Sequence, residues 1–133
     1  MSDGPSYADV VAGVCAAIAA YTHALDDGRV DDVVATFCAD GGCEMPGLGS
    51  PSGHDELRTA YAKVVPQVPQ RHLVLNTHVS DWSGSEASAT SDVVFLVRGE
   101  SGWTVVLIGR YSDTLHRDGD AWRFHHRLAE FVT

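Results

Sequence analysis

The side chains of this sequence that could do chemistry are acid–base groups rather than metal ligands or nucleotide-binding loops. The chain has no HExxH motif, no glycine-rich loop following a strand and no close cluster of His and carboxylate residues, which are the patterns of zinc and nucleotide sites. Cys15, Cys38 and Cys43 form no CxxC pair, so we expect reduced thiols rather than disulfides or a zinc knuckle. We therefore expect no metal and no other cofactor, which leaves proton transfer by Tyr, Asp and His side chains.

The size and charge of the chain narrow its class. Its 133 residues, 44% of them hydrophobic and 20% charged, predict a single globular domain over residues 1–133. The formal net charge is -9 and the nine Lys and Arg are scattered, so we expect neither nucleic acid nor a membrane surface as a partner. The longest apolar stretch, Val10 to Tyr21, has no basic region before it and is too short to cross a bilayer, which favours a cytoplasmic protein.

Hydrophobic spacing predicts two helices at the start of the chain. Apolar residues three and four positions apart indicate a helix from about Tyr7 to Asp26, which Gly28 ends. The same pattern indicates a second, shorter helix from Val30 to Phe37, which ends before residues 40–42. We expect Asp40 to be a turn residue before the first strand.

A short strand and a third helix are predicted next. The strand is expected near residues 43–45. Ser52 with Asp55 three residues later resembles a capping box, and an apolar stripe over residues 57–64 follows it. Pro66 closes this helix.

The second half of the chain has the period of strands. Alternation and turn residues predict four strands joined by hairpins, at about 71–82, 86–98, 102–116 and 121–131. Such long strands twist into a curved antiparallel sheet, and three amphipathic helices can fill its concave side while leaving a cavity at the open end. The fold class is therefore α+β.

One strand predicts contact with another subunit. Both alternating sets of residues 103–108 are largely apolar, whereas a sheet with one solvent-exposed face shows polar residues at alternate positions. We therefore expect a homodimer or homotrimer through the outer face of the sheet, with Leu73, Leu75 and Val79 on that face.

Several local strings, in order, resemble the SnoaL-like family of the nuclear transport factor 2 superfamily from about Ala8 to Phe131. The strings are Tyr21-x-x-Ala24-Leu25-Asp26, Gly28-x-x-Asp31, Phe37-x-x-Asp40-Gly41, Arg71-His72 followed by Asn76, Gly109-Arg110-Tyr111-x-Asp113 and Asp120-Ala121-Trp122-Arg123-Phe124-x-x-Arg127. The resemblance implies a cone-shaped, cystatin-like fold with three N-terminal helices on a strongly curved antiparallel sheet, around a pocket for a small apolar molecule.

The resemblance also implies site residues. Scytalone dehydratase and the bile acid 7α-dehydratases, which share this superfamily, use a Tyr and an Asp from the first helix with a His from the first long strand. Tyr21, Asp26 and His72 stand at the corresponding positions and are the predicted catalytic residues.

Four further residues are predicted to bind substrate: Asn76, Asp92, Tyr111 and Arg127. Asn76 shares the strand parity of His72. Asp92 and Arg127 are assigned by similarity to the bile acid enzymes. Arg127, however, has the opposite parity to Phe124, so the two side chains face apart unless a bulge intervenes.

The implied reaction is elimination of water from a hydroxylated carbonyl compound, or isomerisation of a related one. An imidazole titrates near neutral pH, so His72 would shuttle the proton. Asp26 would orient that ring, and Tyr21 would donate to the carbonyl oxygen. Five residues correspond to about 140° of rotation on an ideal helix, so Asp26 must lie at the end of the helix to reach the same site as Tyr21.

Other interpretations of these residues stay open. Tyr21 lies on an apolar stripe and could be a core aromatic, Asp26 could be a helix-end residue in a turn, and His72 could be structural. The leading hypothesis is a lyase or isomerase acting on a small polycyclic, steroid-like or polyketide-like carbonyl compound. The alternatives are a non-catalytic ligand-binding or oligomerisation module of the same fold, and an epoxide hydrolase with a pair of carboxylates around a water.

Overall fold

A computed structural model of the chain describes residues 4–132. It contains three helices and five strands: α1 (Tyr7–Asp26), α2 (Val30–Ala35), β1 (Phe37–Glu44), α3 (His54–Ala62), β2 (Gln70–Trp82), β3 (Glu86–Gly99), β4 (Gly102–Asp118) and β5 (Ala121–Phe131). The strands form one sheet in the order β1-β5-β4-β3-β2. Its neighbours are antiparallel except for β1, which pairs in parallel with β5.

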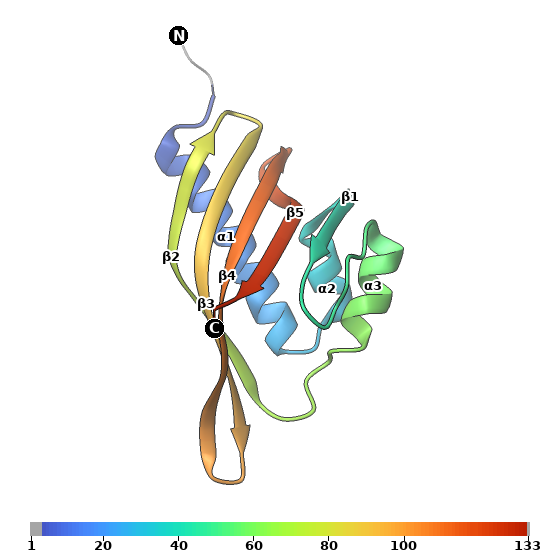
Figure 1. Ribbon diagram of the computed structural model, residues 1–133. Coiled ribbons are helices and arrows are strands. Elements are labelled where there is room, and N and C mark those ends of the chain that lie inside the picture. The colour runs from blue at the N-terminus through green and yellow to red at the C-terminus, as the bar shows by residue number, and fades with distance from the viewer. Residues whose placement is uncertain (1–3, 133) are drawn as a thin grey trace.

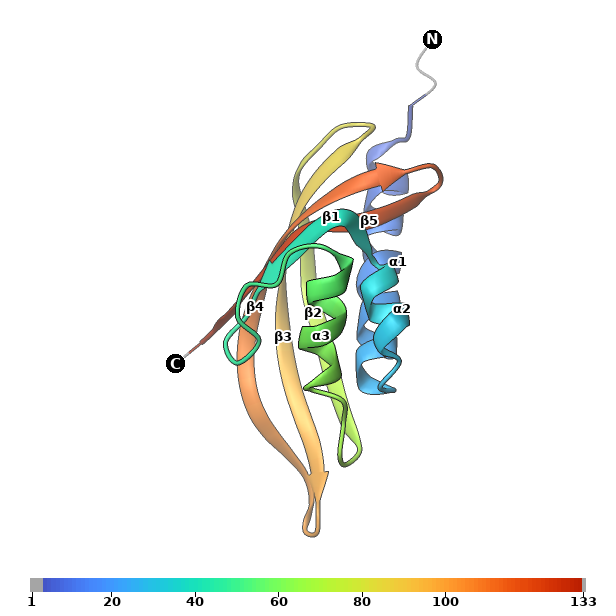
Figure 2. The same cartoon turned by 90° about the vertical axis from the view of Figure 1, so that its right-hand side faces the viewer.

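The sheet curves strongly, and all three helices lie on its concave side (Figures 1 and 2). α1 crosses behind β2 to β5, while α2 and α3 lie beside β1 (Figure 1). The predicted α+β class and cone-shaped architecture are therefore confirmed, with one difference in the sheet, which is mixed and not wholly antiparallel.

Helix α1 matches the predicted range because both of its ends are encoded locally. Ser6 and Asp9 form a reciprocal capping box at the start. Gly28 follows the last turn with φ of +73°, a conformation that favours glycine. By length and composition alone the whole helix is apolar enough to cross a membrane, although its apolar run from Val10 to Tyr21 is too short to do so. In this fold the buried face of the helix packs against the sheet.

The segment after α1 departs from the sequence prediction. α2 ends at Ala35, and Phe37 already begins β1, which continues through residues 40–42. A Cβ at Gly41 would lie 2.6 Å from the carbonyl oxygen of Phe124, so these glycines allow close pairing with β5 instead of forming a turn. Ser52 is also not the cap of α3, because Gly53 holds that position and no side chain caps it.

Two irregularities in the sheet change which side chains face the core. Asn76 has φ of +56°, and the register of β2 with β3 shifts after Leu75. Val79 is consequently 4% exposed and belongs to the core, so its predicted place on the outer face is wrong. In β5, His125 is skipped in the pairing with β4, and this bulge brings Arg127 to the same face as Phe124.

Apolar side chains remain exposed on the outer, convex face of the sheet. Leu73, Leu75, Val105 and Ile108 are each about half exposed, and their cross-strand register places them on the face opposite His72. The β3–β4 hairpin also extends past the other strands (Figure 2).

Gly13 generates a stability prediction. Replacing a helical Gly with Ala ordinarily stabilises a protein by about 0.5–1 kcal/mol. A Cβ at Gly13 would overlap the indole ring of the buried Trp122, and such overpacking costs about 1–3 kcal/mol. We predict that Gly13→Ala lowers the free energy of unfolding by about 1–2 kcal/mol in urea denaturation.

The double variant Gly13→Ala/Trp122→Leu is the control. With the indole removed, the alanine should be neutral or stabilising relative to Trp122→Leu alone. Equal losses in both backgrounds would show that the contact with Trp122 is not the cause.

Candidate active site

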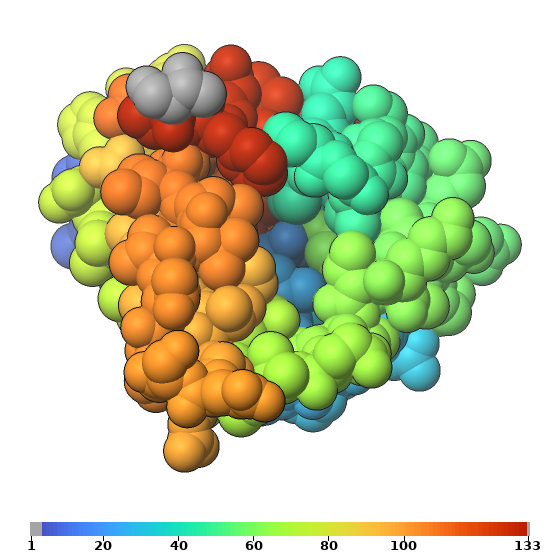
Figure 3. All heavy atoms as spheres, turned by 60° about the horizontal axis from the view of Figure 1, so that its bottom comes forward, coloured from blue at the N-terminus to red at the C-terminus, as the bar shows by residue number. Residues whose placement is uncertain are grey.

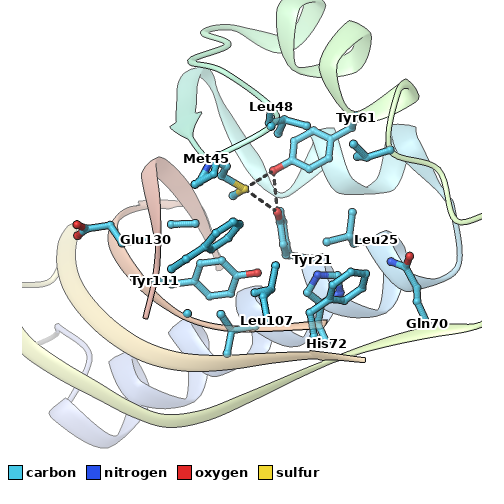
Figure 4. Close-up of a pocket in the computed structure, with 18 residues that line it drawn as sticks. Tyr21, Leu25, Met45, Leu48, Tyr61, Gln70, His72, Leu107, Tyr111 and Glu130 are labelled. Atoms are coloured by element: carbon cyan, nitrogen blue, oxygen red, sulfur yellow. Dashed lines mark hydrogen bonds between the residues drawn. The ribbon is translucent and has the colours of Figure 1, made fainter. Parts of the chain in front are cut away.

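A cavity of about 240 Å³ opens between the concave face of the sheet and the helices. Figure 3 looks into its mouth, which β4, α3 and the loop after β1 surround and at whose base α1 is visible. Most of the lining is apolar, and the polar or ionisable lining residues are Tyr21, Tyr61, Gln70, His72, Tyr111 and Glu130. Figure 4 shows how these residues lie around the cavity.

Asp26 and His72 form the tightest polar contact of the site. The Nδ1 atom of His72 lies 2.6 Å from Oδ1 of Asp26, and the backbone N–H of His72 donates to Oδ2 at 2.8 Å. Gln70 Nε2 donates to Oδ1 at 3.1 Å. Asp26, the last residue of α1, thus binds the start of β2 through both of its carboxylate oxygens. The structure brings together Asp26 and His72, two of the predicted catalytic residues.

This contact fixes the chemistry of the imidazole. An ionised carboxylate only accepts hydrogen bonds, so Nδ1 carries the proton and Nε2 is left as the basic atom. No residue among 4–132 makes a hydrogen bond to Nε2. The ring stacks on Phe95 at 4.4 Å and its side chain is 14% exposed, in the wall of the cavity.

The carboxyl of Asp26 is held in its charged form. Burial by itself would raise its pKa, but the hydrogen bonds from the ring and backbone of His72, and then from Gln70, lower the pKa below the ordinary value. Asp26 therefore stays a carboxylate at neutral pH, as an orienting group for a histidine must.

Tyr21 lies across the cavity from His72 and belongs to a buried network. Its hydroxyl is 2.7 Å from that of Tyr61, and the sulfur atoms of Met45 and Cys43 lie within 4.0 Å of this pair. Burial raises the pKa of both phenols, so both keep their protons at neutral pH. In the sequence, Tyr61 stands only in an apolar stripe, and its helical spacing carries no signal of this role.

Tyr111 presents a hydroxyl to the cavity. The residue is 4% exposed and lines the cavity, and in Figure 4 its oxygen points toward the space between Tyr21 and His72. No hydrogen bond joins it to another residue in the 4–132 range. Because the hydroxyl faces the cavity and has no partner in the described protein, it is available to a ligand.

Arg127 lies behind the cavity rather than in its lining. It is fully buried and pairs with Asp113 through two hydrogen bonds, of 2.9 and 3.3 Å. Its guanidinium carbon lies 3.6 Å from the ring centre of Tyr111 and 4.4 Å from that of Tyr21. A direct contact between Arg127 and a ligand is therefore not supported, because aromatic rings separate the two.

Asn76 and Asp92 do not reach the cavity. Asn76 Nδ2 donates to Asp92 Oδ2 at 2.9 Å, and Arg110 also binds this carboxylate on the outer face of the sheet. The left-handed backbone at Asn76 reverses the strand parity that linked it to His72. The structure thus corrects the prediction that these two residues bind substrate in the pocket.

Within residues 4–132, the remaining ionisable groups do not assemble a different kind of centre. No three His, Cys, Asp or Glu side chains there are arranged to hold a metal ion. Among the described lining residues, Glu130 is the one carboxylic acid, and Asp113 is occupied by Arg127. The carboxylate pair that an epoxide hydrolase requires is therefore not assembled at this cavity.

Comparison with known proteins gives a family and a fold. Residues 7–128 match the SnoaL-like domain family. No curated protein matches the chain.

Three solved structures illustrate the likeness. A protein of unknown function from Mycobacterium tuberculosis is 22% identical with a TM-score of 0.85, and the match covers 92% of this chain and 72% of that one. A protein provisionally named an aromatic ring hydroxylase, from Novosphingobium aromaticivorans, is 23% identical with a TM-score of 0.83, and the match covers 97% of this chain and 92% of that one. A proposed scytalone dehydratase from the same organism is 19% identical with a TM-score of 0.81, and the match covers 93% of this chain and 85% of that one. At these identities the likeness shows the fold alone. One of the matched structures is described as having a cystatin-like fold.

The lowered pKa of Asp26 predicts how stability depends on pH. Because the folded-state pKa lies below the unfolded one, the stabilisation is complete above the ordinary carboxyl pKa and is lost as the pH falls through the folded value. Asp26→Asn should therefore lower the free energy of unfolding by about 2 kcal/mol at pH 7, and the gap between the two proteins should narrow as the pH falls below about 4.

Urea denaturation at several pH values measures this gap. Asp92→Asn is the control, since it removes a carboxylate that is also hydrogen-bonded but lies on the outer surface, and it should change the profile much less. Parallel curves for the unmodified protein and Asp26→Asn would contradict the assignment.

Proposed function

The chain belongs to the SnoaL-like domain family, and from the geometry of its cavity we propose that it is a cofactor-independent lyase or isomerase acting on a small carbonyl compound. The observation that carries this proposal is the buried Asp26 carboxylate bonded to Nδ1 of His72, whose other nitrogen is free at the cavity wall. A base fixed in this way beside an apolar cavity suits removal of a proton from carbon next to a carbonyl.

The first step breaks a C–H bond. Nε2 of His72 takes the proton, the electron pair of that bond forms a C=C bond, and the carbonyl electrons move to oxygen as an enolate. Asp26 stabilises the imidazolium that results. This step neither oxidises nor reduces the substrate, so it needs no redox partner.

Two phenols can stabilise the enolate oxygen. When Tyr61 donates to Tyr21, the proton of Tyr21 is free to point into the cavity. Tyr111 has a hydroxyl directed to the same space. A preorganised donor of this kind is worth about 3–4 kcal/mol in the transition state.

The second step depends on the substrate. If a hydroxyl stands on the carbon beyond, the enolate re-forms the carbonyl, a new C=C bond forms and the hydroxyl leaves with the proton from imidazolium as water. If a conjugated C=C bond is present instead, the imidazolium returns the proton to a different carbon and the result is isomerisation. Both outcomes restore neutral His72.

The cavity supports a compact, uncharged substrate. Its volume of about 240 Å³ is just below the range of about 300–1,000 Å³ of drug-sized pockets. No Lys or Arg occurs among the described residues that line it, so a ligand carboxylate or phosphate would be buried without a cation in direct contact. One- and two-ring ketones fit this description, and larger polycyclic ones would project through the mouth.

One of the matched structures supports this class of reaction. One of the similar folds belongs to a proposed scytalone dehydratase. This likeness makes a lyase the reaction to test first.

We also propose that a second copy of the chain covers the outer face of the sheet. The half-exposed Leu73 and Ile108 lie on either side of Val94 in the sheet, and Leu75 is two residues along the strand from Leu73. Large contiguous apolar patches mark interaction surfaces. The ion pair of Asp92 with Arg110 lies beside them, so this part of the surface does not add to the repulsion between two chains of net charge -9.

Light scattering coupled to size exclusion tests this assembly. We predict that the unmodified protein is a dimer or trimer at micromolar concentration and that Ile108→Lys shifts it to monomer. Val68→Lys, at a position of similar exposure in the loop before β2, should not. A monomeric unmodified protein would contradict the proposal.

Exchange of deuterium into a ketone tests the chemistry without a known substrate. The bicyclic ketone 2-tetralone, incubated with the protein in D₂O, should exchange the protons next to its carbonyl faster than in buffer alone, as measured by NMR. His72→Gln should reduce the protein-dependent rate by at least about a hundredfold, the scale of general base catalysis. Asp26→Asn should also reduce it, because the ring loses its fixed tautomer.

The matched control is His78→Gln, an exposed histidine on the same strand, which should leave the rate unchanged. Melting temperatures of the variants separate lost chemistry from lost fold. Exchange that is equal in the unmodified protein and His72→Gln would overturn the proposed mechanism. Binding of 2-tetralone with no protein-dependent exchange would favour a ligand-binding module.

A further inference from the structure

Arg127 lies on the far side of the rings that form the cavity wall. Its guanidinium carbon is within 4.5 Å of the ring centres of Tyr111, Tyr21 and Phe124, with Tyr111 nearest at 3.6 Å. Two of these three rings carry the hydroxyls that face the cavity. A full positive charge is therefore buried directly behind both candidate oxyanion donors.

Stability alone is a weak explanation for this arrangement. Arg127 is 0% exposed, and its ion pair with Asp113 is buried with it. Buried ion pairs are often no more stabilising than apolar side chains of the same volume. In addition, Nη1 of Arg127 has no hydrogen-bond partner among the described residues, and an unsatisfied buried donor destabilises a fold.

We propose that Arg127, held in place by Asp113, is a positioning residue that favours negative charge on a ligand oxygen by acting through the rings of Tyr111 and Tyr21. This inference rests on the proposed function, because an enolate is the anion that the two hydroxyls would bind. Arg127 itself touches no ligand. Its charge polarises the phenols, whose O–H groups become stronger donors toward an oxyanion.

The titration behaviour of the tyrosines is consistent with this role. Burial raises the pKa of Tyr111, while the charge of Arg127 opposes that rise more than Asp113 reinforces it. The same cation opposes the rise at Tyr21. Arg127 remains charged throughout, because Asp113 and the tyrosines more than offset the effect of its burial and raise its pKa.

A set of ring-substituted 2-naphthols, similar in size and graded in acidity, tests the proposal by binding alone. In the unmodified protein, affinity should rise with naphthol acidity, because the more acidic members bind more readily as the naphtholate anion. In Arg127→Met/Asp113→Leu, which removes both charges together, the preference for the most over the least acidic member should fall about tenfold. Binding of the least acidic member should change little.

Two further variants separate charge from packing. Arg127→Lys keeps the cation and should keep most of the preference, whereas Tyr111→Phe keeps the ring over Arg127 and should lose most of it. A purely structural role predicts equal loss of affinity for every naphthol. An unchanged preference in the double variant, at whatever overall affinity, would therefore overturn the proposal.

A measurement on the unmutated fold covers the case in which the double variant does not fold. With 3,5-difluorotyrosine incorporated, fluorine NMR can follow each phenol as it ionises. Tyr111, stacked on Arg127, should ionise at lower pH than the similarly buried Tyr61, which no cation contacts in the described structure. Ionisation of Tyr61 first would overturn the proposal.

These outcomes are independent of turnover. If the naphthol preference behaves as predicted but 2-tetralone exchange does not depend on His72, the proposed function fails and the role of Arg127 in anion binding stands. If exchange depends on His72 while the preference does not depend on Arg127, the proposed function stands and the role of Arg127 in anion binding fails.

Discussion

The carboxylate of Asp26 is the contact on which the rest of the site depends. It accepts hydrogen bonds from the backbone and ring of His72 and from the side chain of Gln70, and so ties the end of α1 to the start of β2. The same contact sets the tautomer of the imidazole and holds it against Phe95. Each charge-assisted hydrogen bond is worth about 1.5–3 kcal/mol, so one residue contributes both to the closure of the cone and to its chemistry.

The opposite wall is organised by burial of polar groups. Tyr21 and Tyr61 satisfy one another, whereas Tyr111 keeps its hydroxyl for the cavity, and Arg127 provides a positive charge behind the rings. A base on one side and donors on the other leave an apolar space between them, in which hydrogen bonds to a developing anion are stronger than in water. The proposed reaction needs no more than this separation of roles.

Much of this could be predicted from the sequence, and the failures have local causes. Periodicity predicted α1, the long strands and the fold class, and resemblance singled out Tyr21, Asp26 and His72. Strand parity failed at Asn76 and at Arg127, because a left-handed residue and a bulge each shift the register, and neither has a reliable signature in one sequence. Tyr61 was missed because a tyrosine in an apolar helical stripe looks the same whether its hydroxyl serves a site or not.

Long-range ¹H–¹⁵N NMR correlation near neutral pH can show which nitrogen of the His72 ring carries the proton, and this decides whether Asp26 orients the ring as a base. We expect a ring whose neutral form carries its proton on Nδ1, bonded to Asp26, with Nε2 unprotonated toward the cavity. Asp26→Asn should lose that preference. A neutral ring with its proton on Nε2 in the unmodified protein would contradict this orienting role of Asp26.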